Sequence, residues 1–85
     1  MKQFTYLIKR APGIHARPAC LLAMLAGEYK DTAITVTKDG KTVDCELLNL
    51  ISLDARPGSE VTVAAEGPNE EAAIERLTSF FQEKL

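Results

Sequence analysis

The sequence predicts an α+β fold in which helices cover one face of a four-stranded sheet. Apolar side chains recur at every second residue near the start of the chain, as in a half-buried strand. Asp39-Gly40 is a two-residue hairpin signal, and apolar residues recur with helical spacing near the end. Because 85 residues can fill only one core, burying about 60 to 65% of the unfolded surface, we expect a single domain spanning residues 1–85.

The first half of the chain is expected to contain one strand and one helix. Apolar and polar side chains alternate over residues 4–8, which predicts a strand. Ala-Pro-Gly at residues 11–13 ends that strand, and strong helix formers follow over about residues 16–26. Pro18 fits only in the first turn of this helix.

The middle of the chain is expected to form a hairpin followed by a short apolar segment. Residues 32–37 and 41–45 are the two predicted strands, joined at Asp39-Gly40 by a turn that requires positive φ. Residues 47–53 are compatible with one or two helical turns or with a strand, and periodicity does not decide between them.

The last third is expected to contain a turn, a strand and a helix. Arg56-Pro57-Gly58 has the residue preferences of a type II turn. Residues 60–65 form the next predicted strand, and Asn69 is a candidate cap for the helix that follows. The apolar stripe of this helix consists of Ile74, Leu77 and Phe81. With residues 47–53 as a short helix, the order is strand, helix, strand, strand, helix, strand, helix.

Composition argues against several classes of function. The net charge is −2 and the pI is near 5.3, with no basic cluster, so we expect neither a nucleic acid nor an anionic membrane as partner. No apolar run approaches 18 residues, so we expect no membrane insertion and a cytoplasmic location. Cys20 and Cys45 lack metal-ligand spacing, and one histidine with two cysteines is a poor metal set. We therefore expect reduced thiols, no metal and no cofactor.

His15 is the chain's only histidine, and it lies between a glycine-containing turn and the start of a predicted helix. A helix N-terminus stabilises an anion by roughly 0.3 to 2 kcal/mol, and neutral imidazole has a nucleophilic nitrogen. Arg17 could bind phosphate oxygens through its guanidinium, and the N–H groups of Ala16 and Arg17 could hold the same oxygens. Two other interpretations are that His15 only caps the helix beside a solvated Arg17, or that Cys20 and His15 form a nucleophile pair, which would lack an orienting Asn or Asp nearby.

The predicted helix over residues 16–26 is apolar nearly all round, although a helix on an open sheet needs only one apolar stripe. Ala16, Cys20 and Met24 share one side at helical spacing, so their exposure would create an apolar patch beside His15. The same patch could be extended by Leu47, Leu48 and Ile51. The alternative is that all of these residues belong to the core.

Gly-Ile-His-Ala-Arg-Pro-Ala at residues 13–19 resembles the active-site signature of the HPr family, the histidine-containing phosphocarriers of the sugar phosphotransferase system. The resemblance extends over essentially the whole chain. It includes, in order, Asp39-Gly40-Lys41, Ser52-Leu53, the Gly58 turn, the strand up to Glu66-Gly67 and the amphipathic last helix.

The resemblance implies an open-faced β-sandwich, with a four-stranded antiparallel sheet and three helices on one face. It implies that Enzyme I phosphorylates His15 on Nδ1 at the expense of phosphoenolpyruvate, and that the phosphoryl group passes to sugar-specific Enzyme IIA domains. The protein would be a monomeric carrier, a reactant in a relay and not an enzyme, with Arg17 stabilising the phosphate. The implied partner contacts are Cys20, Met24, Leu47, Leu48 and Ile51. An alternative with the same site is an HPr-like regulator whose phosphorylation state controls enzymes or transcription factors.

Two departures from the family pattern affect what is expected of this chain. Many HPr proteins have a regulatory serine before the second helix, but residues 45–48 are Cys-Glu-Leu-Leu, and neither Thr42 nor Ser52 matches the position. We therefore expect no regulatory serine. Family members often carry lysines around the docking patch, where this chain has Met24, Gly27, Glu46 and Asn49. Docking should then rest more on apolar contact and less on salt-sensitive attraction.

Overall fold

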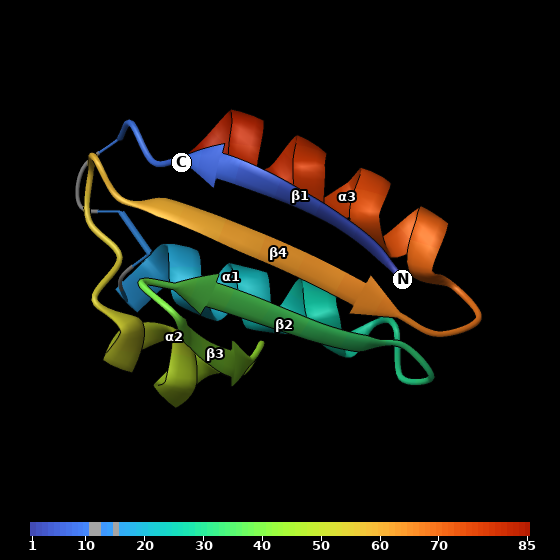
Figure 1. Cartoon of the computed structure of the whole chain (residues 1–85). Helices are drawn as coiled ribbons and strands as arrows, with labels where there is room; N and C mark the ends of the chain where they lie inside the picture. The colour runs from blue at the N-terminus through green and yellow to red at the C-terminus, as the bar shows by residue number, and fades with distance from the viewer. Residues whose placement is uncertain (11–12, 15) are drawn as a thin grey trace.

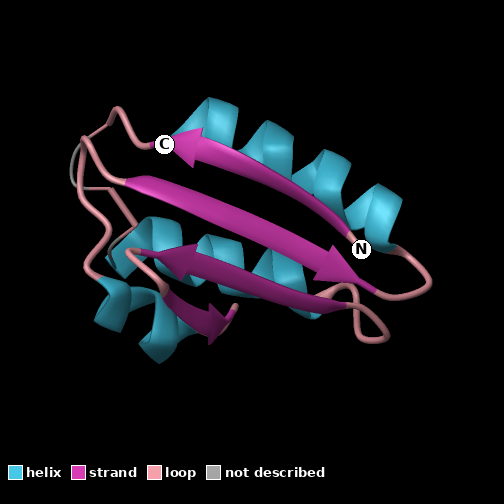
Figure 2. Cartoon of the chain, viewed as in Figure 1, coloured by secondary structure: helices cyan, strands magenta, loops and turns pink. Residues whose placement is uncertain are grey.

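A computed structural model describes residues 1–10, 13, 14 and 16–85. The elements are β1 (Lys2–Leu7), α1 (Ala16–Gly27), β2 (Ala33–Lys38), β3 (Lys41–Asp44), α2 (Leu47–Leu53), β4 (Glu60–Glu66) and α3 (Glu70–Lys84). Within this described part, three helices lie on one face of a four-stranded sheet and the other face is open (Figures 1 and 2). The predicted α+β open-faced sandwich is therefore confirmed.

The sheet has the strand order β1-β4-β2-β3, and every neighbouring pair is antiparallel. Val63 of β4 pairs with Phe4 of β1 on one side and with Val36 of β2 on the other. The last strand in the sequence therefore lies between the first and the second.

The core lies between the sheet and the helices. Alternation in β4 buries Val61 and Val63, and α3 covers them with Leu77 and Phe81, which are also fully buried. The Phe81 ring lies edge-to-face against Phe4, with ring centroids 5.4 Å apart. The predicted α3 stripe is correct for these two residues. Ile74 also packs against the core but is only half-buried, whereas the neighbouring Ala73 is fully buried.

Both predicted turns are confirmed. Asp39 and Gly40 have φ values of 51° and 81°, as the two-residue hairpin requires. Gly58 has a φ of 94°, and the N–H of Ser59 donates to the carbonyl of Arg56 at 2.9 Å.

The segment left open by the sequence is helix α2. Leu50 and Leu53, three residues apart, are both buried under this helix, as one face of helical turns requires. Asp54 ends the helix in the left-handed conformation, with a φ of 52°. The ammonium of Lys38 then donates to the carbonyls of Leu53 and Asp54 at 3.1 and 3.2 Å, which ties the end of α2 to the hairpin.

Asn69 occupies the N-cap position of α3, but its side chain makes no capping hydrogen bond, so the predicted capping role is wrong. Its backbone N–H instead donates to the hydroxyl of Thr32 at 3.2 Å. The Glu70 carboxylate accepts the N–H of Gly67 at 3.3 Å and pairs with the N-terminal ammonium at 2.9 Å. These two contacts, the ammonium first, hold the pKa of Glu70 below its usual value.

Candidate functional site

The chain approaches the predicted site through a fixed turn. Gly13 has a φ of 87°, and a Cβ built there would lie 2.2 Å from the carbonyl oxygen of Ala55. That same oxygen accepts the N–H of Ile14 at 2.9 Å, and the Ile14 side chain is fully buried. The loop after α2 therefore holds the two residues that precede His15. His15 itself lies outside the described residues.

Helix α1 begins directly after His15, as predicted. Ala16 is its first residue and Pro18 its third, so the missing N–H of proline falls in the first turn, where no intrahelical bond is lost. The N-terminal end of this 12-residue helix, with its partial positive charge, therefore directly follows His15 in the sequence.

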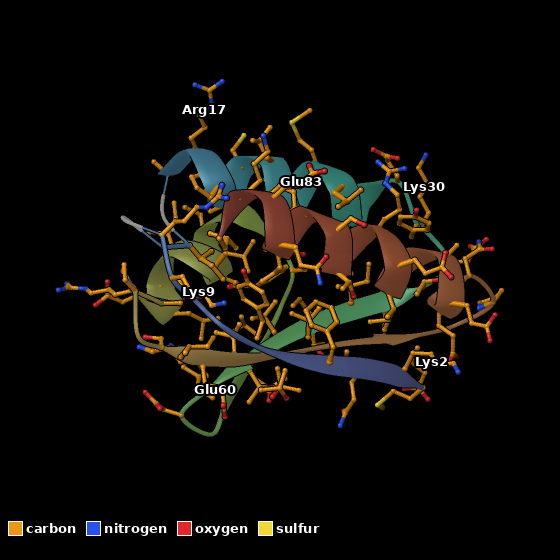
Figure 3. The ribbon with its side chains drawn as sticks, turned by 90° about the horizontal axis from the view of Figure 1, so that it is seen from above. Lys2, Lys9, Arg17, Lys30, Glu60 and Glu83 are labelled. Atoms are coloured by element: carbon orange, nitrogen blue, oxygen red, sulfur yellow. The ribbon has the colours of Figure 1, made fainter. Side chains whose placement is uncertain are left out.

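Arg17 is exposed at the start of α1 and has no hydrogen-bond or ion-pair partner in the described part of the chain. Its side chain extends away from the body of the molecule (Figure 3). A permanently charged guanidinium with unused donors can bind phosphate oxygens in a bidentate manner. The structure thus brings Arg17 and the end of α1 together.

An exposed apolar surface continues along α1 and onto α2, which packs beside it. Met24 is 65% exposed, Leu48 79% and Leu47 38%, and the Cys20 thiol is also exposed. The alternative in which all of these residues belong to the core is therefore wrong. We define the docking patch as Cys20, Leu21, Met24, Leu47 and Leu48.

Two members of this surface differ from the prediction. Ile51 is half-buried and packs against the core, so it lies at the margin of the patch. Leu21 is 37% exposed and was missed. Its spacing gives the signal that could have found it, since it lies four residues after Arg17 and three before Met24 and so shares their side of the helix.

The two cysteines are free thiols in different surroundings. Cys20 is exposed, whereas Cys45 is buried under α1, and burial raises the pKa of the Cys45 thiol to about 12. Residues 1–10, 13, 14 and 16–85 contain no group of three His, Cys, Asp or Glu side chains able to hold a metal. The predicted Cys20–His15 nucleophile pair includes His15, which lies outside the described residues.

The surface before α2 carries no serine. Glu46 occupies the N-cap position and its side chain makes no capping hydrogen bond. The two nearest hydroxyls both have partners: Ser52 donates to the carbonyl of Asn49, and Thr42 shares a hydrogen bond with Thr37, each at 2.7 Å. Among the helices described, none is long and apolar enough to cross a membrane.

Comparison with known proteins matches residues 2–83 to a family model described as the PTS HPr component phosphorylation site. The chain is 34% identical over 79 residues to the HPr-like protein Crh of Bacillus subtilis, which covers 92% of each chain. It is 39% identical over 75 residues to the phosphocarrier protein HPr of Mycoplasma genitalium, covering 87% of this chain and 85% of the other. A crystal structure of HPr from Thermoanaerobacter tengcongensis is 38% identical and superposes with a TM-score of 0.93, covering 99% of this chain and 94% of that one.

Proposed function

Because the chain belongs to the HPr family of the phosphotransferase system, we propose that it is the sugar-relay phosphocarrier, which accepts a phosphoryl group on His15 from phospho-Enzyme I and passes it to Enzyme IIA domains. One observation carries this proposal. The family model that matches residues 2–83 is described as the PTS HPr component phosphorylation site, and His15 is the only histidine in the sequence. A phosphohistidine carrier built from this chain has no other residue to use.

The transfer balances as an exchange of one P–N bond for another. A lone pair on a neutral His15 nitrogen attacks the phosphorus of the donor phosphohistidine in line, and the P–N bond of the donor breaks. The electron pair of that bond returns to the donor imidazole. Arg17 and the N-terminal end of α1, including the backbone of Ala16, would stabilise the negative charge that develops on the phosphoryl oxygens. The chain is consumed and regenerated in the relay, so it acts as a reactant and not as an enzyme.

The docking patch supplies the surface on which each partner brings its reactive group to His15. It extends along α1 and onto the start of α2 with exposed apolar side chains, and the flexible Met24 can adapt to more than one partner surface. We take the monomer as the working unit, since one histidine and one patch suffice for each transfer. Light scattering of the purified protein measures this directly.

Intact-mass spectrometry at neutral or alkaline pH tests the function. The protein is incubated with Enzyme I, phosphoenolpyruvate and magnesium, with His15→Ala as the matched control. We expect one acid-labile phosphate on the parent only, removed when an Enzyme IIA domain is added. Arg17→Ala should slow the transfer without lowering the melting temperature, because Arg17 is exposed and forms no hydrogen bond or ion pair with the described residues. A parent that gains no phosphate from several competent Enzyme I preparations contradicts the proposal.

A second candidate is a regulator whose phosphorylation state controls enzymes or transcription factors. The 34% identity to the HPr-like protein Crh favours it. The same experiment separates the two functions, because a regulator would gain the phosphate on His15 and no Enzyme IIA domain would remove it.

A further inference from the structure

A groove lies at the far end of the docking patch. It runs between the second half of α1 and the segment that joins β3 to α2. Its apolar wall includes Ala23 and Ala26 of α1, Ile34 of β2, the buried Cys45 and Leu47 of α2. Leu47 belongs to both the groove and the docking patch, so the two surfaces are continuous.

Two carboxylates on this groove have no ion-pair partner among the residues that the structure describes. Asp44 and Glu46 both line it and are exposed, and neither side chain forms an ion pair in the structure. Lys30 also lines the groove but forms no ion pair with either of them. The groove therefore has an apolar wall and an excess of negative charge.

A partner footprint of standard size, centred on the start of α1, reaches this groove. Ala23 and Ala26 lie seven and ten residues along α1 from Ala16, which at about 1.5 Å per residue is roughly 10 to 15 Å from the start of the helix. A standard protein interface covers about 800 Å² per partner, equivalent to a disc of about 16 Å radius. A footprint of that size centred on the start of α1 extends over the groove.

Resting on the proposed function, we propose that the phosphoryl-donor protein seats an apolar side chain in this groove and sets a lysine or arginine against Asp44 and Glu46. If the donor covered these two carboxylates without supplying a cation, both would lose their hydration with no compensating interaction. This desolvation penalty would oppose docking. A basic residue on the donor converts that penalty into attraction and fixes the orientation of the complex. This chain would then select a donor surface that is basic at this edge. Docking would keep a salt-sensitive part, in contrast to the expectation drawn from the missing lysines around α1.

The charged half of the proposal is tested by the double variant Asp44→Asn/Glu46→Gln. Its matched control is Glu60→Gln/Glu66→Gln, which removes the same charge from β4, where both glutamates are exposed and unpaired in the structure. Glu60 lies on the side of the molecule opposite Arg17 (Figure 3). The assay is the rate of phosphoryl transfer from phosphorylated Enzyme I of the same organism, measured against carrier concentration at low and high salt.

We expect the groove variant to raise KM about tenfold at low salt with kcat unchanged, and the difference to shrink at high salt as the charges are screened. The control should behave as the parent. An equal KM for the two double variants overturns the proposal. A lower KM for the groove variant also overturns it, because the donor surface would then be acidic at this edge.

The apolar half is tested by filling the groove with Gly27→Leu. Gly27 lines the groove, and a Cβ built there meets nothing within 4 Å, so the fold has room for the new side chain. We expect KM to rise while the melting temperature stays within a few degrees of the parent, with Gly27→Ala as the control. A folded Gly27→Leu with the KM of the parent overturns the apolar contact. A parent that Enzyme I fails to phosphorylate overturns the proposed function itself, whatever the variants do.

Discussion

Replacing Gly13 with alanine should destabilise the protein and displace the chain segment that precedes His15. The added Cβ would lie 2.2 Å from the carbonyl oxygen of Ala55 and 2.9 Å from the Cα of Arg56. Carbon and oxygen atoms in contact normally stay well beyond 3 Å apart. One backbone segment must therefore move by about 1 Å, and both segments help to position the residues before α1.

The matched variant Gly58→Ala separates strain from collision. Gly58 has a similar φ of 94°, but a Cβ there meets nothing within 4 Å. Its cost is the left-handed strain of about 1 to 2 kcal/mol, offset by about 0.4 to 1 kcal/mol from the stiffer unfolded chain. At Gly13 the displaced Ala55 carbonyl also leaves the buried N–H of Ile14 without its partner, which adds about 1 to 3 kcal/mol.

Thermal unfolding followed by circular dichroism measures the difference. At about 4 to 8 °C per kcal/mol for a domain of this size, Gly58→Ala should lower the melting temperature by at most about 13 °C. Gly13→Ala should lower it by about 4 to 24 °C more than Gly58→Ala does. At a temperature where both are folded, Gly13→Ala should also be phosphorylated more slowly than Gly58→Ala. Equal melting temperatures for the two variants would refute the collision with Ala55.

Four further predictions concern parts of the fold away from this turn. Phe81→Ala should cost about 3 to 5 kcal/mol in urea unfolding, because the ring is fully buried, and a loss below 1 kcal/mol would contradict its place in the core. Lys38→Met should cost about 1 to 3 kcal/mol by removing the charged donor at the end of α2, whereas the exposed Lys41→Met should change stability by less than about 0.5 kcal/mol. A thiol reagent at pH 8 should modify Cys20 quickly and Cys45 only in denaturant. Burial raises the pKa of the Cys45 thiol from 9.0 to about 12. The unfolded state therefore loses this proton first, and the free energy of unfolding should fall as pH rises between these values. The fall should be smaller in Cys45→Ala.

The strands and turns were predictable because their signals are local. Asp39-Gly40 and Gly58 adopt positive φ as their residue types require, and alternation found β4. Residues 47–53 could not be assigned because a seven-residue apolar run suits either structure. What decides it is tertiary: Leu50 and Leu53 face the core, and Lys38, distant in sequence, caps the last carbonyls.

The site was predictable where sequence position alone fixes the geometry. A helix starting at Ala16 places Arg17 in its first turn, whatever the rest of the fold does. Asn69 lies at the predicted N-cap position, but its side chain makes no capping hydrogen bond, and its backbone N–H donates to the distant hydroxyl of Thr32. The contact of Ala55 with Gly13 and Ile14 could not be predicted from the sequence. It is made by the backbone carbonyl of Ala55, which any residue type would supply.

The strand order has a consequence for how the chain is made. β1 leaves the ribosome first, yet its only hydrogen-bonded neighbour in the sheet is β4, at residues 60–66. β2 also needs β4 to join it to β1. Until β4 has been synthesised, the elements before it can form the β2–β3 hairpin and helices but not the complete sheet. The apolar faces of these elements therefore stay exposed to chaperones and proteases until β4 is added. Insertion of this late central strand is then the event that commits the molecule to its fold.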